Sequence, residues 1–216
     1  DPALLGLVTL LSNGVVIGNG SAGVVNVNNS ATGTLNGTSG ILGLNLGTLN
    51  GMALNINNGA GGSTTIVNNG SIVSSALLGL TLLSADAPVV AVRGGSQVNM
   101  TNNGTLVGRV AFQSSTAGNN FTNTVQVTGG VALGGGSTRS FTAVTGSSVS
   151  SNASIGISLG GLLGVDLTFA PTGQIDGGAG GSNTLLLQNT LGVGGGTTGS
   201  GTVSSANYVN FNNLTL

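Results

Sequence analysis

The chain has 216 residues, of which 42 are glycine and only 3% are charged, and its net charge at pH 7 is −1. It contains no Lys, Glu, His, Cys or Trp. These absences remove nearly every side chain used for acid–base, covalent or metal-assisted catalysis, so the composition predicts a structural or adhesive protein and not an enzyme. The composition also provides no basic surface for nucleic acid.

Hydrophobic residues make up 39% of the chain, which is enough for a core. No apolar run approaches the roughly 18–20 residues of a transmembrane helix. Gly and β-branched residues disfavour helix throughout, and the best helical candidate is the short segment 76–83. Alternating apolar residues instead predict short β-strands from one end of the chain to the other. This alternation is seen at Val25/Val27, Leu54/Ile56, Val98/Met100, 106–112, 121–127, 155–159, Leu185/Leu187 and Leu214/Leu216.

Two short patterns recur along the chain. The first is an apolar block at 3–11 and 76–83, with related forms at 41–46 and 162–167. The second is a turn block, in which a pair of asparagines precedes Gly or Ser. Recurrence of this kind is typical of chains that wind into successive similar coils. The turn block lies at 27–30, 56–59, 67–70 and 101–104.

The asparagines of the turn block are candidates for a structural role. If successive coils stack, equivalent side-chain amides can form ladders in which each amide donates and accepts a hydrogen bond. The alternative is that Asn-Gly merely marks the turns of β-hairpins. The scarcity of charge favours the ladder, because hairpins usually carry Lys and Glu on their solvent face. The candidate residues are Asn28, Asn29, Asn57, Asn58, Asn68, Asn69, Asn102 and Asn103.

Three segments resemble the repeats of bacterial autotransporter passenger domains: 65–72, 98–106 and 173–187. The segment 206–216 is similar to the strand that follows the repeats in such passengers. The resemblance covers roughly two thirds of the chain and is weakest in 112–150. It implies a right-handed parallel β-helix, displayed on the outer surface of a bacterium and often adhesive.

Together these features predict an all-β fold, a single right-handed parallel β-solenoid domain over 1–216. The range 112–150 is the candidate for an irregular insertion. Coils of about 18–24 residues would give about ten turns, which at a strand spacing of ~4.8 Å form a rod about 50 Å long. The end strand has no evident cap, so Leu214 and Leu216 are candidates for assembly with another copy.

Glycine-rich segments are the first candidates for a ligand site. The segment 177–185 approximates the calcium-binding nonapeptide of secreted toxins. However, Ser182 and Asn183 stand where that motif needs Asp, and only Asp176 is near, so a plain glycine-rich turn is the alternative. We therefore expect no metal site and no cofactor. Two other segments lack the Lys of a phosphate-binding loop and are predicted to be loops, 134–138 and 194–198.

The charged residues offer little for catalysis. Asp166 and Asp176 could pair as acid and base in a polysaccharide-cleaving β-helix enzyme, but no Lys or His supports them. Arg93, Arg109 and Arg139 are far apart in sequence and are predicted to be lone surface charges. The sequence therefore predicts no catalytic residue.

The preferred function is a subunit of an extracellular bacterial fibre, which assembles head-to-tail with copies of itself at the cell surface or in the biofilm matrix. Its adhesive partner would be a host surface, an abiotic surface or a matrix polysaccharide. The near-zero charge, the small side chains and the uncapped ends favour such stacking. The alternative is an autotransporter passenger segment that acts as a monomeric adhesin stalk, and a polysaccharide-cleaving enzyme is a third hypothesis.

Overall fold

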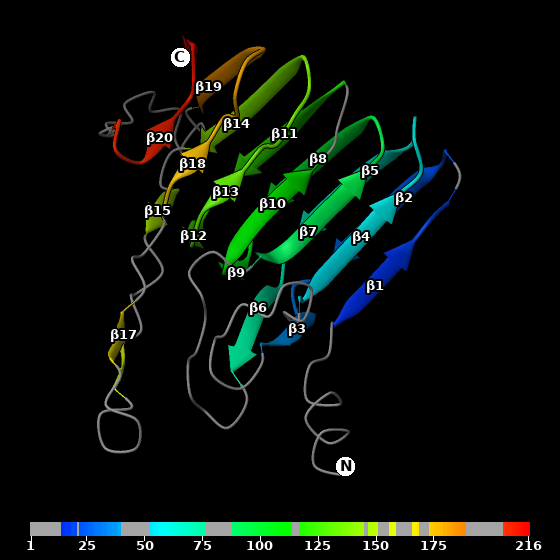
Figure 1. The fold of residues 1–216 in the computed structure, drawn as a ribbon, viewed down its shortest axis with the longest axis vertical. Coiled ribbons are helices and arrows are strands. Elements are labelled where there is room, and N and C mark those ends of the chain that lie inside the picture. The colour runs from blue at the N-terminus through cyan, green and yellow to red at the C-terminus, as the bar shows by residue number, and fades with distance from the viewer. Residues whose placement is uncertain are drawn as a thin grey trace, which may run out of the picture.

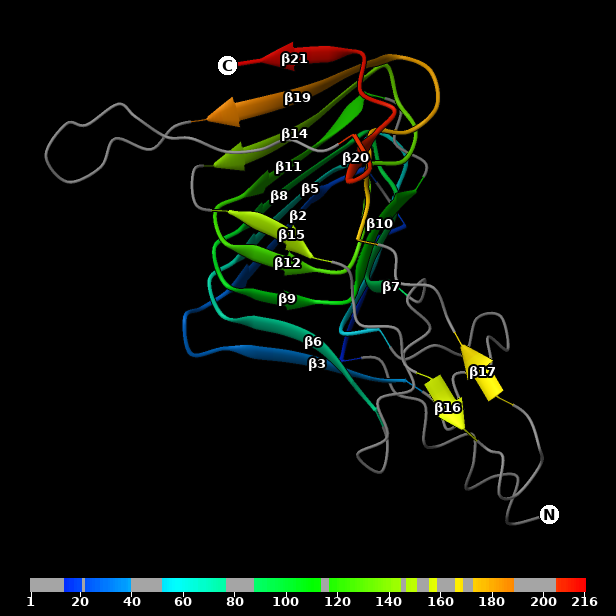
Figure 2. The ribbon, with the colours of Figure 1, turned by 90° about the vertical axis from the view of Figure 1, so that its left-hand side faces the viewer.

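The chain folds into β-strands, and no helix occurs, in the part that a computed structural model describes. Three sheets contain parallel strands: sheet A and sheet B have seven strands each, and sheet C has five (Figures 1 and 2). The prediction of an all-β fold is confirmed. The described residues are 14–20, 22–39, 52–76, 88–113, 117–144, 147–150, 156–158, 166–168, 173–188 and 205–216.

The chain passes from sheet A to sheet B to sheet C and then returns to sheet A. We call one such passage a rung, and we keep the name for the last two passages, in which the described residues include strands of sheets A and B alone. Figure 1 shows the strands of sheet A side by side, from β1 to β20, and Figure 2 shows those of sheets B and C. The rungs are rung 1, β1 (Val15–Gly18), β2 (Val24–Asn29) and β3 (Thr34–Ser39); rung 2, β4 (Leu54–Asn58), β5 (Ser63–Asn68) and β6 (Ser71–Ala76); rung 3, β7 (Pro88–Gly94), β8 (Gln97–Asn102) and β9 (Thr105–Val107); rung 4, β10 (Arg109–Gln113), β11 (Gly118–Asn123) and β12 (Gln126–Thr128); rung 5, β13 (Val131–Ala132), β14 (Thr138–Val144) and β15 (Ser148–Ser150); rung 6, β18 (Ile175–Asp176) and β19 (Ser182–Gln188); and rung 7, β20 (Tyr208–Val209) and β21 (Asn213–Thr215).

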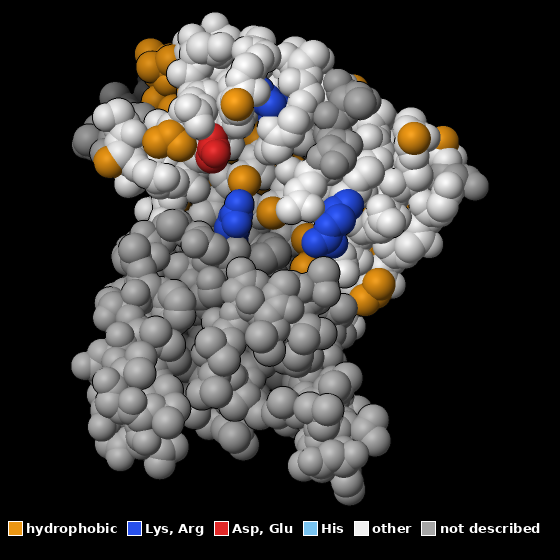
Figure 3. All heavy atoms as spheres, viewed as in Figure 1, with side chains coloured by type: hydrophobic (Ala, Val, Ile, Leu, Met, Phe, Trp, Pro, Cys, Tyr) orange, Lys and Arg blue, Asp and Glu red, His pale blue; other side chains and the backbone are white. Residues whose placement is uncertain are grey.

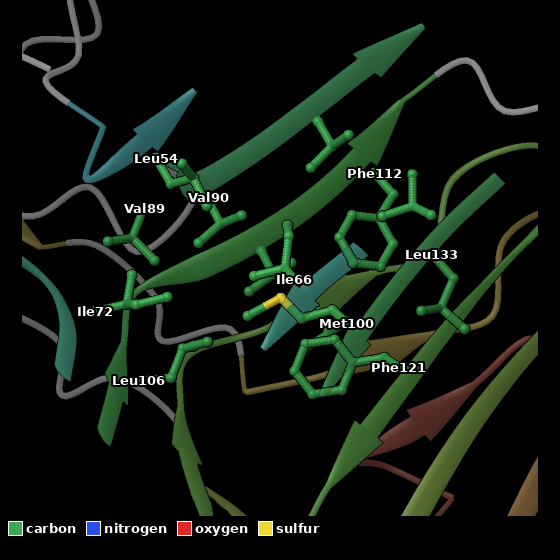
Figure 4. Packing of buried hydrophobic residues seen from close by; sticks show 14 of the residues in the cluster. Leu54, Ile66, Ile72, Val89, Val90, Met100, Leu106, Phe112, Phe121 and Leu133 are labelled. Carbon is green, nitrogen blue, oxygen red and sulfur yellow. The ribbon is translucent and has the colours of Figure 1, made fainter. Parts of the chain in front are cut away.

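Parallel pairing in register aligns equivalent side chains of successive rungs into columns, because neighbouring residues of a strand point to opposite faces of its sheet. Each sheet contains an apolar inward column, and these columns meet in a common core (Figure 4). Each fully buried Leu or Ile stabilises the fold by about 1.5–3 kcal/mol. The columns are Val15, Leu54, Val90, Val110, Val131, Ile175 and Tyr208 in sheet A; Val27, Ile66, Met100, Phe121, Phe141, Leu185 and Leu214 in sheet B; and Leu35, Ile72, Leu106, Val127 and Val149 in sheet C.

Glycine corners join rungs 3, 4 and 5. Gly108 alone separates β9 from β10, and Gly129 and Gly130 separate β12 from β13. The φ angles of Gly108 and Gly129 are 122° and 132°, values that favour glycine. A Cβ atom on Gly129 would lie 2.4 Å from the carbonyl oxygen of Gly108, so there is no room for a side chain. These tight corners let the chain return from sheet C to sheet A within one or two residues.

Longer connections join sheet C to sheet A elsewhere, between β3 and β4, β6 and β7, and β15 and β18. The recurring apolar blocks fall in these connections, with 41–46 in the first, 76–83 in the second and 162–167 in the third. The blocks 3–11 and 41–46 lie outside the described residues, and the other two lie largely outside them. Ala76, where the helical candidate begins, is the last residue of β6. The apolar repeat therefore occurs in three of the connections that lead from a strand of sheet C to the next strand of sheet A, those after rungs 1, 2 and 5.

The described residues form fewer rungs than the sequence predicts for the whole chain. The longest sheets have seven strands in the described residues, and not about ten, because the long connections use much of the chain. Seven strands at a spacing of ~4.8 Å form a stack about 30 Å long. The order of the parallel strands is consistent with a β-solenoid.

The range 112–150, which the sequence offers as an irregular insertion, is regular in the described residues. The described residues of 112–150 belong to β10–β15, and these strands pair in parallel register with their neighbours. The strands that depart from the parallel pattern are β16 (Gly156–Ser158) and β17 (Asp166–Thr168), which form an antiparallel pair. They lie in the connection between rungs 5 and 6.

Candidate functional site

A row of buried asparagine side chains crosses four rungs at the corner between sheets B and C. These asparagines are the last residues of β2, β5, β8 and β11, and their backbones pair in register. We call this row the asparagine ladder. Each side-chain nitrogen donates a hydrogen bond to the side-chain oxygen of the next rung: Asn29 Nδ2 to Asn68 Oδ1 (2.8 Å), Asn68 Nδ2 to Asn102 Oδ1 (2.8 Å) and Asn102 Nδ2 to Asn123 Oδ1 (3.1 Å).

The asparagine ladder also holds the turn into sheet C. The Nδ2 atom of Asn29 donates to the carbonyl of Ser71 (3.1 Å), and that of Asn68 donates to the carbonyl of Thr105 (3.0 Å). Asn123 ends the ladder by donating to a main-chain carbonyl. The four asparagines are at most 5% exposed, and a buried polar group without a partner costs about 1–3 kcal/mol. The ladder therefore satisfies this corner without any charged group.

The structure separates the eight predicted asparagines, because only one of each adjacent pair points inward. Asn28, Asn57, Asn69 and Asn103 are exposed, and their neighbours are buried. An outer row nevertheless exists beside the ladder, in which Asn103 Nδ2 donates to Asn69 Oδ1 (3.0 Å). Thr124 extends this row, since its Oγ1 donates to Asn103 Oδ1 (2.9 Å).

Asn123 belongs to the ladder but not to the turn block. It is followed by Thr124, whereas the turn block requires a second asparagine. The signal that would have found Asn123 is an apolar residue two positions before the ladder position, which points to the same face of the strand. The residues at that earlier position are Val27, Ile66, Met100 and Phe121.

Buried amides also hold the corner between sheets A and B. Asn58 lies there and not in the asparagine ladder: its Oδ1 accepts a hydrogen bond from Asn19 Nδ2 (2.9 Å), and its Nδ2 donates to main-chain carbonyls of the corner. In rung 4 the same corner contains Asn119, whose Oδ1 accepts from the main-chain nitrogen of Val98 (3.1 Å) and whose Nδ2 donates to the carbonyl of Leu133 (2.6 Å). Each of these asparagines ties its corner to a neighbouring rung.

Arg139 occupies the equivalent corner of rung 5, and the prediction that it is a surface charge is wrong. Its side chain is only 2% exposed, and its backbone pairs in register with Asn183 of rung 6. The Nε atom donates to Asn183 Oδ1 (2.7 Å), and Nη1 donates to the carbonyl of Gly134 (2.7 Å). The Nη2 atom donates to the carbonyls of Ala179 (3.2 Å) and Gly180.

The segment 177–185, considered above as a calcium loop, directs its oxygen atoms at protein donors. Two of its carbonyls accept from Arg139, and Asn183 Nδ2 donates to the carbonyl of Gly178 (2.8 Å). The Oδ1 atom of Asp176 accepts from the main-chain nitrogen of Gly178 (2.8 Å) and from a side-chain amide of rung 7 (2.7 Å). Within the described residues, no three His, Cys, Asp or Glu residues gather into a metal-binding group.

The remaining candidates for chemistry lie partly outside the described residues. Asp166 lies in β17 and Asp176 in β18, and these strands belong to different sheets. The side chain of Asp166 and the segment 194–198 lie outside the described residues. In the segment 134–138, the carbonyl of Gly134 faces the guanidinium of Arg139, so this loop presents an acceptor there.

Charged side chains are sparse on the surface. Arg93 on β7 donates from Nη1 to Asn55 Oδ1 (2.9 Å) and from Nε to Gln113 Oε1 (3.1 Å). Figure 3 shows the few charged groups of one face separated by white polar and backbone atoms. Among the described residues of this face, the blue groups and the red group do not touch one another (Figure 3).

Aromatic side chains form a continuous row inside rungs 4 to 7. Phe121 and Phe141 stack with ring centroids 5.4 Å apart and an interplanar angle of 8°. The row continues to Phe112 on one side, and to Tyr208 and Phe211 on the other. Such pairs contribute about 0.5–1.5 kcal/mol each beyond the area they bury. Burial also raises the pKa of Tyr208 above its ordinary value of 10.0.

The candidate assembly residues lie at one end of the stack. Leu214 in β21 is 61% exposed, and Leu216 is 91% exposed. At the opposite end, Val16 in β1 and Val24 in β2 are 62% and 70% exposed. The large hydrophobic residues that are exposed in the described part of the chain therefore lie in its terminal rungs.

No protein-family model, curated protein or solved structure matches this chain. The described ranges contain no helix that is long and apolar enough to span a membrane. The function must therefore be argued from the geometry of the rungs.

Proposed function

We propose that this chain is an extracellular bacterial structural protein, a right-handed parallel β-solenoid that assembles head-to-tail into an adhesive fibre of the cell surface or biofilm matrix. The observation that carries this proposal is that the same apolar columns reach both ends of the stack. Val15 and Val27 begin the columns of sheets A and B, and Tyr208 and Leu214 end them.

Head-to-tail contact would continue both columns into the next copy. Rung 7 of one copy, placed before rung 1 of another, brings Leu214 next to Val27 and Tyr208 next to Val15. The exposed edges of β2 and β21 have main-chain groups that can pair as parallel strands do. The net charge of −1 provides almost no repulsion between copies.

Electron microscopy of the purified chain tests the proposal directly. We expect unbranched filaments without any added cofactor. Leu214→Lys should leave single short rods, because it places a charge in the end contact. Asn57→Lys adds the same charge to an exposed position on the side of the stack and should still form filaments. The fibre proposal is wrong if the unaltered chain remains a single rod at every concentration.

A specific observation favours the alternative, a passenger segment that acts as a monomeric adhesin stalk. The asparagine ladder runs one way, with Asn29 Nδ2 donating to rung 2, so a rung placed before rung 1 would have to donate to Asn29 Oδ1 to continue the ladder. A β21 strand placed against β2 in register offers Leu216 at this position, which has no amide to donate. Another asparagine-bearing rung of the same chain would donate to it. Sedimentation of a longer chain as a monomer would support this alternative.

A further inference from the structure

The corner between rungs 5 and 6 contains a buried cation. Among the described residues, Arg139 is the only charged side chain that is buried. Burial of a charge is unfavourable unless hydrogen bonds replace the lost water. The partners of Arg139 are all neutral amide oxygens, from Asn183 and from three main-chain carbonyls. The cation is therefore stabilised by the dipoles of these neutral groups and not by an opposite charge.

Two glycine-rich loops supply the carbonyls. Gly134 belongs to the loop before β14, and Ala179 and Gly180 belong to the loop before β19. The φ angles of Gly134 and Gly180 are 72° and 70°, which other residues rarely adopt. A Cβ atom on Gly181 would lie 3.0 Å from Arg139 Nη2, so the second loop closes tightly over the guanidinium.

The acceptors are arranged for a planar group with several nitrogens. Nε, Nη1 and Nη2 of Arg139 each have their own acceptor, and these acceptors come from three separate parts of the corner. A lysine ammonium has a single nitrogen and cannot reach all of them. A calcium ion prefers carboxylate oxygens among its ligands, and the four acceptors of Arg139 include no carboxylate. The chemical class that fits is a guanidinium.

We propose that this corner is a guanidinium-binding site, which the chain fills with its own Arg139, and that the occupied site fastens rungs 6 and 7 to rung 5. The contacts bridge positions 40 to 44 residues apart. They therefore span the connection that contains β16 and β17. In stacked folds a rung is held mainly by its neighbours, so loss of this contact should loosen the rungs beyond it and spare the earlier ones. The site does not depend on whether the chain forms fibres.

Hydrogen–deuterium exchange of two variants tests this site. Arg139→Met keeps the length of the side chain and removes its donors, and Arg139→Lys keeps the charge. Both should speed amide exchange in rungs 6 and 7 by roughly tenfold or more, and leave rungs 1 to 3 unchanged. The matched control Arg93→Met removes a partly exposed arginine that bonds to Asn55 of rung 2 and Gln113 of rung 4, and it should leave exchange in rungs 6 and 7 unchanged.

Chemical rescue tests the ligand class. In Arg139→Ala, millimolar methylguanidinium should restore slow exchange in rungs 6 and 7, whereas methylammonium and calcium should not. Equal rescue by calcium would overturn the assignment to guanidinium. No effect of Arg139→Met on rungs 6 and 7 would overturn the fastening role.

If the variants do not fold, the burial of Arg139 can still be tested on the unaltered chain, by the exchange of its Nε–H proton with water. The chain has three Lys and Arg residues in all, and each is an arginine, so only three arginine Nε–H signals can appear in a nitrogen-15 spectrum. The signal of Arg139 should exchange with water far more slowly than the other two. Equally fast exchange of all three signals would refute the buried site.

Discussion

Rungs 1 to 4 and rungs 5 to 7 use different means to hold the same kind of stack. The first four are joined by the asparagine ladder at the corner between sheets B and C. In the later rungs the ladder position is occupied by Ala143 and then by Leu187. There the aromatic row and the buried Arg139 connect the rungs instead.

The difference shows what the ladder is for. Sheet C ends with β15, one rung after Asn123 ends the ladder, in the described residues. A chain that turns from sheet B into sheet C must bury main-chain groups at the corner, and an inward asparagine can pair with them. Ala143 and Leu187 cannot do so. In rung 5 the amide of the rung below serves instead: Asn123 Nδ2 donates to the carbonyl of Ser148 (3.3 Å), where the chain turns into β15. The ladder therefore serves the turn into sheet C in one more rung than it occupies.

The largest expected effect comes from breaking the aromatic row. Phe121→Ala removes a fully buried ring that contacts both Phe112 and Phe141. It should lower the free energy of unfolding by about 3–5 kcal/mol, as measured by urea denaturation. Phe121→Leu fills most of the space and should cost less than about 1.5 kcal/mol. Equal losses in both variants would mean that the row is not closely packed.

Breaking the asparagine ladder in its middle should have the next largest effect. Asn68→Ala removes one of the two acceptors of Asn29 Nδ2, the other being the carbonyl of Ser71, and leaves Asn102 Oδ1 and the carbonyl of Thr105 without the donor that Asn68 provides. The free energy of unfolding should fall by about 2–4 kcal/mol. Asn28→Ala changes an exposed asparagine of the same turn block and should change it by less than about 0.5 kcal/mol. If the two variants are equally stable, the ladder does not stabilise rungs 1 to 4.

The glycine corner between rungs 4 and 5 lies where the two regions meet. Gly129→Ala adds a methyl group close to the carbonyl of Gly108 at a φ of 132°. We expect a loss of about 2–3 kcal/mol in the free energy of unfolding. Gly20→Ala is the matched control, since a Cβ atom there meets nothing within 4 Å. A similar loss at both positions would show that the corner is not the cause.

The smallest effect should appear at alkaline pH. Burial raises the pKa of Tyr208 in the folded state, so the neutral phenol is favoured there. The stability from this group is complete below pH 10.0 and is lost as the pH rises through the raised pKa. Urea midpoints measured up to strongly alkaline pH should fall for the unaltered chain and stay level for Tyr208→Phe. The chain has one tyrosine and no lysine or cysteine, so the phenolate absorbance reports this group alone.

The sequence predicts the inward columns well and the corners less well. Alternation alone identifies Leu54, Ile56, Val98 and Met100 as one-sided strand residues, because a parallel sheet repeats this pattern in every rung. It also indicates the inward asparagine where a single apolar residue stands two positions earlier, as at Asn29 and Asn102. It gives no answer at 66–69, where Ile66 and Val67 are both apolar and point to opposite faces. The register between rungs decides there, since it pairs Asn28 with Val67 and Asn29 with Asn68.

For Arg139, the charge predicts exposure and the alternation predicts burial, and the alternation is correct. It stands two positions before Phe141, so the strand pattern directs both side chains to the interior. Its acceptors come from loops that lie 40 or more residues away as well as from the nearby Gly134, and sequence spacing alone cannot bring them together. The apolar repeat indicates where the long connections fall in the sequence. It does not predict how many residues each connection uses, and so the number of rungs cannot be predicted from it.

The burial of Arg139 has a consequence for the environments in which the protein can work. With this residue inside, no charged side chain remains on the outer faces of sheets B and C in the described strands. Dissolved ions weaken interactions between charges, and acid or alkali changes the charge of titrating groups. Neither can act on a surface of hydroxyls, amides and methyl groups. These two faces should keep the same properties in fresh water and in brine, and in acidic and in alkaline surroundings.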